Sequence, residues 1–228
     1  MPKRNLWLLL LVVTVGCVAA GNVVRDDDSP GPFLEKMFAS ARTHRTDDIL
    51  QYRSKVDGSQ SMILKAGYAL ALYISDPTQY QAQFVRSFPT DREGLSSLIN
   101  LIESKNLTPR FMYSVEALGE IAATGDAVAT EKIVRASGQA DGGPGEVICA
   151  EFSKIVKRAP GAVVKSFSSM DEARRREGYV CLELLDPVDI PIVRARLIAQ
   201  RKNEQSAKKR AVVDEMLSRV QEAGHAGM

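Results

Sequence analysis

Residues that could carry out chemistry are few and widely separated in this chain of 228 residues. The two histidines, His44 and His225, are far apart and do not form a pair at metal-ligand spacing, and the chain has no Cys-x-x-Cys motif. Ser206 and Lys209 satisfy a Ser-x-x-Lys spacing, but they lie in a highly charged segment without the companion motifs of enzymes that use it. We therefore expect a non-enzymatic protein with no cofactor and no metal.

The cysteines offer a second kind of chemistry. In an exported protein, Cys149 and Cys181 would be candidates for a disulfide bond. A disulfide needs the two Cα atoms within about 7 Å, whereas the axes of neighbouring helices lie about 8–10 Å apart. The alternative is that both are small buried apolar residues, and the sequence leaves the choice open.

Basic side chains concentrate near the C-terminus. From Arg194 to Arg219 the chain has eight basic and three acidic residues. This segment predicts contact with an acidic partner, such as anionic lipid headgroups, an acidic protein or a cell-envelope polymer, and its alternative is a solvated helix face. The candidate partner-binding residues are Arg194, Arg196, Arg201, Lys208 and Lys209. A formal net charge of only +2 argues against nucleic acid as the partner.

The N-terminus is typical of an export signal. Lys3 and Arg4 precede an apolar run from Leu6 to Val15, which is shorter than the roughly 20 residues of a membrane-spanning helix. We expect a signal peptide over 1–16, or over 1–20 if cleavage follows Ala20.

The segment Thr14–Cys17 resembles a bacterial lipobox, although Thr14 is a less typical first residue than leucine. The resemblance implies a lipid on Cys17, followed by a polar tether over 17–32. The expected location is the bacterial cell envelope, as a membrane lipoprotein facing the periplasm or the cell exterior. The alternative is a soluble periplasmic or secreted protein.

The elements that must position these residues are helices. From Phe33 onward, apolar residues recur at three- and four-residue spacing, and no long alternating segment predicts a strand. We expect a helical domain over 33–223, a loop at 141–145 where four of five residues are Gly or Pro, and a flexible tail over 224–228. The expected helices include 59–75, 78–88, 90–105, 108–125, 127–137, 146–158, 171–185, 192–202 and 206–222.

Some helical segments are similar to one another. Ile148–Phe152 aligns with Val180–Leu184, and Tyr113–Ala117 aligns one period earlier. A period of about 32–40 residues is typical of α-solenoids, and the chain resembles armadillo- and HEAT-type helical repeats in period and helical character. The resemblance implies an all-α, right-handed α-solenoid of about five helical hairpins. The alternative is an irregular multi-helix bundle.

Such a fold favours binding over catalysis. We expect a cell-envelope scaffold or a module that binds a protein or peptide, attached to the membrane through its lipid. One alternative is a small-ligand-binding or enzymatic α-helical bundle, which would have a deep pocket with convergent charged groups. Another is a subunit that self-associates through its apolar helices.

Overall fold

The computed structural model describes residues 30–104, 108–139 and 142–226, and all the regular structure in these ranges is helical. The prediction of an all-α protein is therefore confirmed. The helices are α1 (Pro30–Arg42), α2 (Thr46–Leu50), α3 (Arg53–Gly58), α4 (Met62–Ser75), α5 (Pro77–Ser87), α6 (Arg92–Ser104), α7 (Thr108–Ala123), α8 (Ala127–Ser137), α9 (Gly142–Arg158), α10 (Pro160–Ser169), α11 (Glu172–Gly178), α12 (Val180–Glu183), α13 (Ile190–Asn203) and α14 (Ala207–Ala226).

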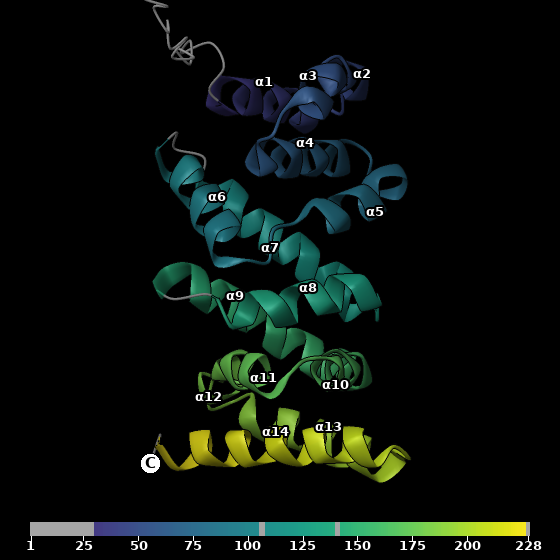
Figure 1. Ribbon diagram of the computed structural model, residues 1–228, viewed down its shortest axis with the longest axis vertical. Helices are drawn as coiled ribbons and strands as arrows, with labels where there is room; N and C mark the ends of the chain where they lie inside the picture. The colour runs from purple at the N-terminus through teal and green to yellow at the C-terminus, as the bar shows by residue number, and fades with distance from the viewer. Residues whose placement is uncertain (1–29, 105–107, 140–141, 227–228) are drawn as a thin grey trace, which may run out of the picture.

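The helices succeed one another along the long axis of the molecule in their order along the chain (Figure 1). Helices α1 to α3 lie at one end, and α13 and α14 lie at the other. Most packing joins elements close in sequence, such as α4 with α5, α7 with α8 and α9, and α13 with α14. One apolar core runs through this stack from Leu34 to Val220.

Acidic and hydroxyl side chains begin several of these helices, because they accept hydrogen bonds from backbone N–H groups that have no partner within the helix. Ser61 accepts from the Leu64 N–H at 3.1 Å. Asp76 precedes Pro77 and accepts from the Gln79 N–H at 3.1 Å. Helix α6 differs from the predicted range 90–105, since Asp91 accepts from the Gly94 N–H at 2.7 Å and the helix begins two residues later, at Arg92.

Three predicted segments differ more strongly from the structure. The Gly- and Pro-rich segment predicted as a loop belongs to α9 from Gly142 onward. Proline is tolerated there because the first turn of a helix has no intrahelical acceptors for its N–H groups. The tail predicted over 224–228 is helical through Ala226, and 227–228 lie outside the described residues.

The third difference matters most for the binding surface described below. The segment predicted as one helix over 171–185 is divided into α11 and α12. Tyr179 lies at the division, where it is buried against Phe167 and donates a hydrogen bond to Glu215 at 2.8 Å. Gly178 allows this approach, because a Cβ there would stand 2.7 Å from Phe167 Cε1. The division between the two helices therefore coincides with a buried tyrosine, Tyr179, whose own backbone stays in the helical region.

The N-terminal predictions fall largely on residues that are not described. The signal peptide over 1–16 or 1–20 and Cys17 lie outside the described ranges. Of the predicted tether, residues 30–32 belong to the first turn of α1. None of the helices in the described ranges combines the length and the apolar content needed to cross a bilayer.

Candidate binding surface on α9

A hollow of ≈ 750 Å³ runs along one side of α9, between this helix and the segment that joins α12 to α13. We call it the α9 groove. Its lining residues are Gly145, Glu146, Cys149, Ala150, Ser153, Lys154 and Lys157 from the helix, with Leu184, Leu185, Asp186 and Asp189 from the facing segment.

The helical spacing of the lining residues makes the groove long. Gly145 and Lys157 mark its ends on α9, and at 1.5 Å of rise per residue they are separated by roughly 18 Å along the helix. The middle of this stripe has the short side chains of Cys149, Ala150 and Ser153. The opposite side of α9 is built from larger apolar side chains that fill the core, which are Ile148, Phe152, Ile155 and Val156. Helix α9 therefore packs through one side and forms a shallow floor with the other.

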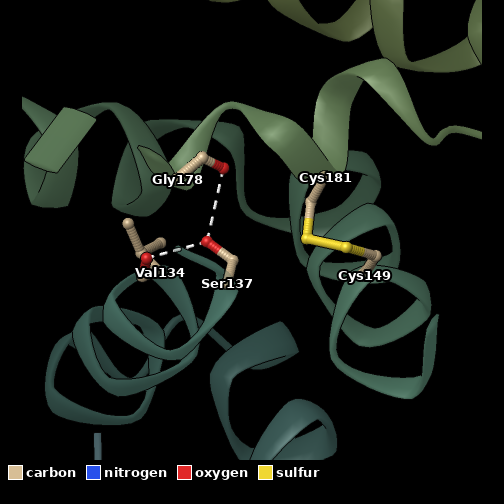
Figure 2. The surroundings of a disulfide bond; sticks show 5 residues. All are labelled: Val134, Ser137, Cys149, Gly178 and Cys181. Carbon is tan, nitrogen blue, oxygen red and sulfur yellow. Dashed lines mark hydrogen bonds between the residues drawn. A yellow bond between two sulfur atoms is a disulfide. The ribbon is translucent and has the colours of Figure 1, made fainter. Parts of the chain in front are cut away.

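The facing wall, residues 184–189, is held at both ends. At one end a disulfide bond joins Cys149 to Cys181 of α12, with a Cα–Cα distance of 4.8 Å (Figure 2). At the other end the Asp189 carboxylate accepts hydrogen bonds from Ser153 Oγ at 2.8 Å and from Lys157 Nζ at 2.7 Å. The hydrogen bond from Lys157 is the main cause that lowers the pKa of Asp189, so this anchor is ionised at neutral pH.

Large aliphatic side chains are exposed along this wall and just beyond it. Leu184 is 65% exposed, Val188 is 72% exposed and Ile192 is 48% exposed. We call these three residues the apolar rim. Single exposed aliphatic residues are ordinary, but three at four-residue intervals, of which Leu184 also lines the groove, mark a surface that a partner could cover.

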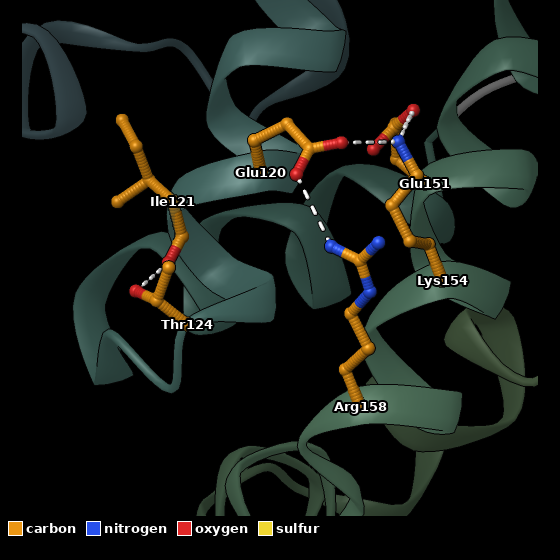
Figure 3. A network of polar contacts seen from close by, with 6 residues as sticks. All are labelled: Glu120, Ile121, Thr124, Glu151, Lys154 and Arg158. Atoms are coloured by element: carbon orange, nitrogen blue, oxygen red, sulfur yellow. Dashed lines mark hydrogen bonds and ion pairs between the residues drawn. The ribbon is translucent and has the colours of Figure 1, made fainter.

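A polar network centred on Lys154, at the edge of the groove, joins α9 to α7 (Figure 3). Lys154 Nζ donates to Glu120 at 2.9 Å and to Glu151 at 2.8 Å, and Arg158 pairs with Glu120 at 3.2 Å. Burial alone would lower the pKa of Lys154, but its hydrogen bonds to the two glutamates raise it. Lys154 is therefore a charged residue whose charge is already compensated within the protein.

The basic residues predicted to bind a partner lie on α13 and α14, which pack together. On α13, Arg194 and Arg196 are both exposed, but two residues along a helix turn it by about 200°, so they project from different flanks. Arg201 is paired with Asp214 of α14, and Lys209 lies 3.9 Å from Glu204. Lys208 is exposed on α14. Two of the five predicted residues thus already have acidic partners in the same molecule.

The residues considered for catalysis do not converge on a site. His44 is exposed in the turn after α1, with φ 53°, and its Nδ1 lies 3.1 Å from the Ser75 carbonyl oxygen. Ser206 accepts a hydrogen bond from the Lys209 N–H at the start of α14, as a helix cap does. Within the described ranges, no three side chains of His, Cys, Asp or Glu lie close enough to hold a metal ion.

The α9 groove was not predicted from the sequence. The sequence predicted that Leu184 belongs to a helix over 171–185, and it made no prediction for Asp189. The available signal was the series Leu184, Val188 and Ile192 with Pro187 and Pro191 between its members. Apolar residues at this spacing around two helix-breaking prolines are compatible with an exposed connection, but the spacing does not reveal which helix the connection faces.

Comparisons with protein-family models, with curated proteins and with solved structures found no match to this chain.

Proposed function

We propose that this chain is an exported, non-enzymatic binding module whose α9 groove receives a segment of another protein. The observation that supports this most directly is the pairing of a groove of ≈ 750 Å³ with an exposed apolar rim. A groove roughly 18 Å long matches an extended peptide of about five or six residues, at about 3.3 Å per residue. Burial of the rim by such a segment would provide the driving force.

The finer architecture that we propose is a right-handed α-solenoid of about five helical hairpins, similar to armadillo and HEAT proteins. The order of the helices along one axis and the packing of α7 on both α8 and α9 support it. Helix α14 presents an exposed polar side at the end of the stack, with Asp214, Ser218 and Glu222 among its residues. Polar terminal helices are typical of capped solenoids, and they disfavour self-association through the C-terminal end.

Export and lipid attachment belong to the same proposal. The disulfide between Cys149 and Cys181 supports export, because disulfides persist in oxidising compartments such as the periplasm. A lipid on Cys17 would anchor the module in the bacterial cell envelope. Changing Cys17 to Ser and fractionating cells tests this part: the protein should move from the membrane to the soluble fraction, and an unchanged distribution contradicts the lipid anchor.

A small-molecule ligand is the second candidate, because the volume of the groove lies within the range of about 300–1,000 Å³ that such sites occupy. Its exposed rim favours a larger partner, which would cover more apolar surface than a small molecule inside the groove. Crosslinking from within the groove separates the two candidates.

A photo-crosslinking amino acid at Ala150 tests the proposal in cells that export the full chain. Ala150 is exposed in the floor of the groove, and Ala211 is an exposed alanine on α14 that serves as the control position. We expect Ala150 to capture a defined protein segment that Ala211 does not capture, and the purified segment to bind the purified protein. Identical capture from both positions, or binding of a metabolite alone, contradicts the proposal.

A further inference from the structure

The charges around the α9 groove narrow the chemistry of its partner. Its two basic residues are both neutralised by carboxylates of the same molecule. Lys157 is paired with Asp189 at 2.7 Å, and Lys154 is paired with Glu120 and Glu151 at 2.9 and 2.8 Å. Neither lysine is available to attract an anion without losing an existing ion pair.

The acidic residues of the groove are in the opposite situation. Glu146 and Asp186 are exposed, and neither forms an ion pair with any cation in the part of the chain that the structure describes. Asp186 Oδ1 accepts a hydrogen bond from the Val188 N–H at 2.9 Å, which orders the wall but leaves the negative charge uncompensated. The uncompensated charge of the groove is therefore negative.

The apolar features of the groove lie among these charges. Leu184 belongs both to the lining and to the apolar rim, next to Leu185 and two positions from Asp186. Cys149 and Ala150 face the same hollow from α9. A ligand that satisfied both features would bury an aliphatic side chain and place a positive charge beside a carboxylate.

From this arrangement we infer that the α9 groove binds a peptide segment in which aliphatic residues alternate with lysine or arginine. The inference rests on the proposed function and deepens it by naming the chemistry of the partner. The aliphatic side chains pack against Leu184 and the floor of α9, and the basic side chains lie beside Glu146 and Asp186. Opposite charge steers the segment toward the groove and disfavours acidic competitors.

This partner differs from the one expected from the sequence. The basic residues near the C-terminus predicted an acidic partner, but in the structure Arg201 and Lys209 already face Asp214 and Glu204 of the same chain. The α9 groove combines exposed apolar surface with uncompensated charge, and its charge has the opposite sign.

Three synthetic octapeptides test the inference by fluorescence polarisation with the purified full-length protein. The first alternates leucine with lysine, the second alternates leucine with glutamate, and the third alternates serine with lysine. We expect the leucine–lysine peptide to bind about tenfold or more tightly than the leucine–glutamate peptide, since two favourable charge contacts together provide roughly that factor. It should also bind more tightly than the serine–lysine peptide, which has the same charges but no aliphatic side chains to bury. The preference over the glutamate peptide should decrease as salt is added.

Two double variants then locate the charge effect. Glu146→Gln with Asp186→Asn should remove most of the preference for lysine over glutamate peptides. The control, Glu35→Gln with Asp47→Asn, changes the net charge equally at the far end of the stack, where both residues are exposed, and should leave the preference intact. Equal loss in both variants, or no loss in the groove variant, overturns the inference.

The outcomes also distinguish this inference from the proposed function. If the leucine–glutamate peptide binds more tightly, and Ala150→Trp abolishes that binding, the groove is a peptide site but its charge preference is opposite to the one inferred. If none of the three peptides binds, the inference is wrong, and the crosslinking experiment at Ala150 decides separately whether the groove binds a protein at all.

Discussion

The side chain of Glu151 on α9 lies directly against the backbone of Gly119 on α7. A Cβ atom on Gly119 would stand 2.7 Å from Cδ and 2.8 Å from Cβ of Glu151. Glu151 is only 5% exposed, and its Oε2 has no hydrogen-bond partner among the described residues. This close approach fixes α9 on α7 and so determines which side of α9 is left to form the groove.

Replacing Gly119 with alanine should therefore destabilise the protein. The clash involves Glu151 Cβ, which is fixed to the α9 backbone, so rotation of the side chain cannot relieve it. Overpacking of this kind costs about 1–3 kcal/mol, which urea unfolding would detect as a lower midpoint.

The matched control is Gly58→Ala at the end of α3, where an added Cβ would meet nothing within 4 Å. This variant should be as stable as the wild type or slightly more stable. Equal stability of the Gly119 and Gly58 variants would show that α7 and α9 do not approach as closely as described.

Burial raises the pKa of Glu151 above its ordinary value of 4.5, and the hydrogen bond from Lys154 opposes this only in part. Glu116 and Glu120 of α7 add to the upward shift, while Lys154 is the nearest cation. A carboxyl group whose pKa is raised by folding binds its proton more tightly in the folded state. Its contribution to stability is therefore present below about pH 4.5 and is lost as the pH rises through the raised pKa.

Glu151→Gln removes this titration. Relative to the wild type, the variant should gain stability on going from about pH 4 to about pH 8. The reason is that the buried glutamate becomes charged over this range, whereas the amide of glutamine stays neutral. Unfolding curves at several pH values measure the difference. A stability difference that stays constant, or that shifts toward the wild type with rising pH, would be inconsistent with a raised pKa at Glu151.

Local signals in the sequence predicted the all-α class and several helix boundaries. They also predicted helix α5, which follows Asp76. Helix α8 spans the predicted residues 127–137, because Asp126 caps it and Gly138 follows it. The break between α11 and α12 was not evident from the sequence, since Tyr179 at the break contacts Phe167 and Glu215, which belong to other helices.

The same limitation applies to the groove. Cys149 and Cys181 were candidates for a disulfide bond, but the expected distance between the axes of two neighbouring helices left open whether their Cα atoms could come close enough. The structure joins Cys149 to Cys181 with Cα atoms 4.8 Å apart, because α12 is a four-residue helix seated on α9 instead of a full-length neighbour. Asp189 anchors the wall through contacts with Ser153 and Lys157 that no local spacing encodes.

Removing the disulfide should destabilise the fold and loosen the groove wall. Its cysteines are separated by 32 positions, and closing a loop of this length stabilises the folded state by about 3–4 kcal/mol in the chain-entropy treatment. The double variant Cys149→Ser with Cys181→Ser should therefore unfold at a markedly lower denaturant concentration than the oxidised wild type.

Hydrogen exchange measures whether loss of the disulfide loosens the groove wall itself. Amides of the wall, residues 184–189, should exchange faster in the double variant, while those of α4, at a distance along the stack, should change less. Equal acceleration in both regions would assign the effect to global unfolding, and unchanged exchange in the wall would contradict the role of the disulfide as its anchor.

The most direct test of the account is the affinity of the purified protein for the segment captured at Ala150, measured for three proteins. Ala150→Trp places an indole ring in the groove floor, and Ala211→Trp places the same ring on the exposed side of α14. If the α9 groove is the binding site, the dissociation constant should be at least about tenfold higher for Ala150→Trp and unchanged for Ala211→Trp. Wild-type affinity in a folded Ala150→Trp variant would show that the partner binds elsewhere and would contradict the account.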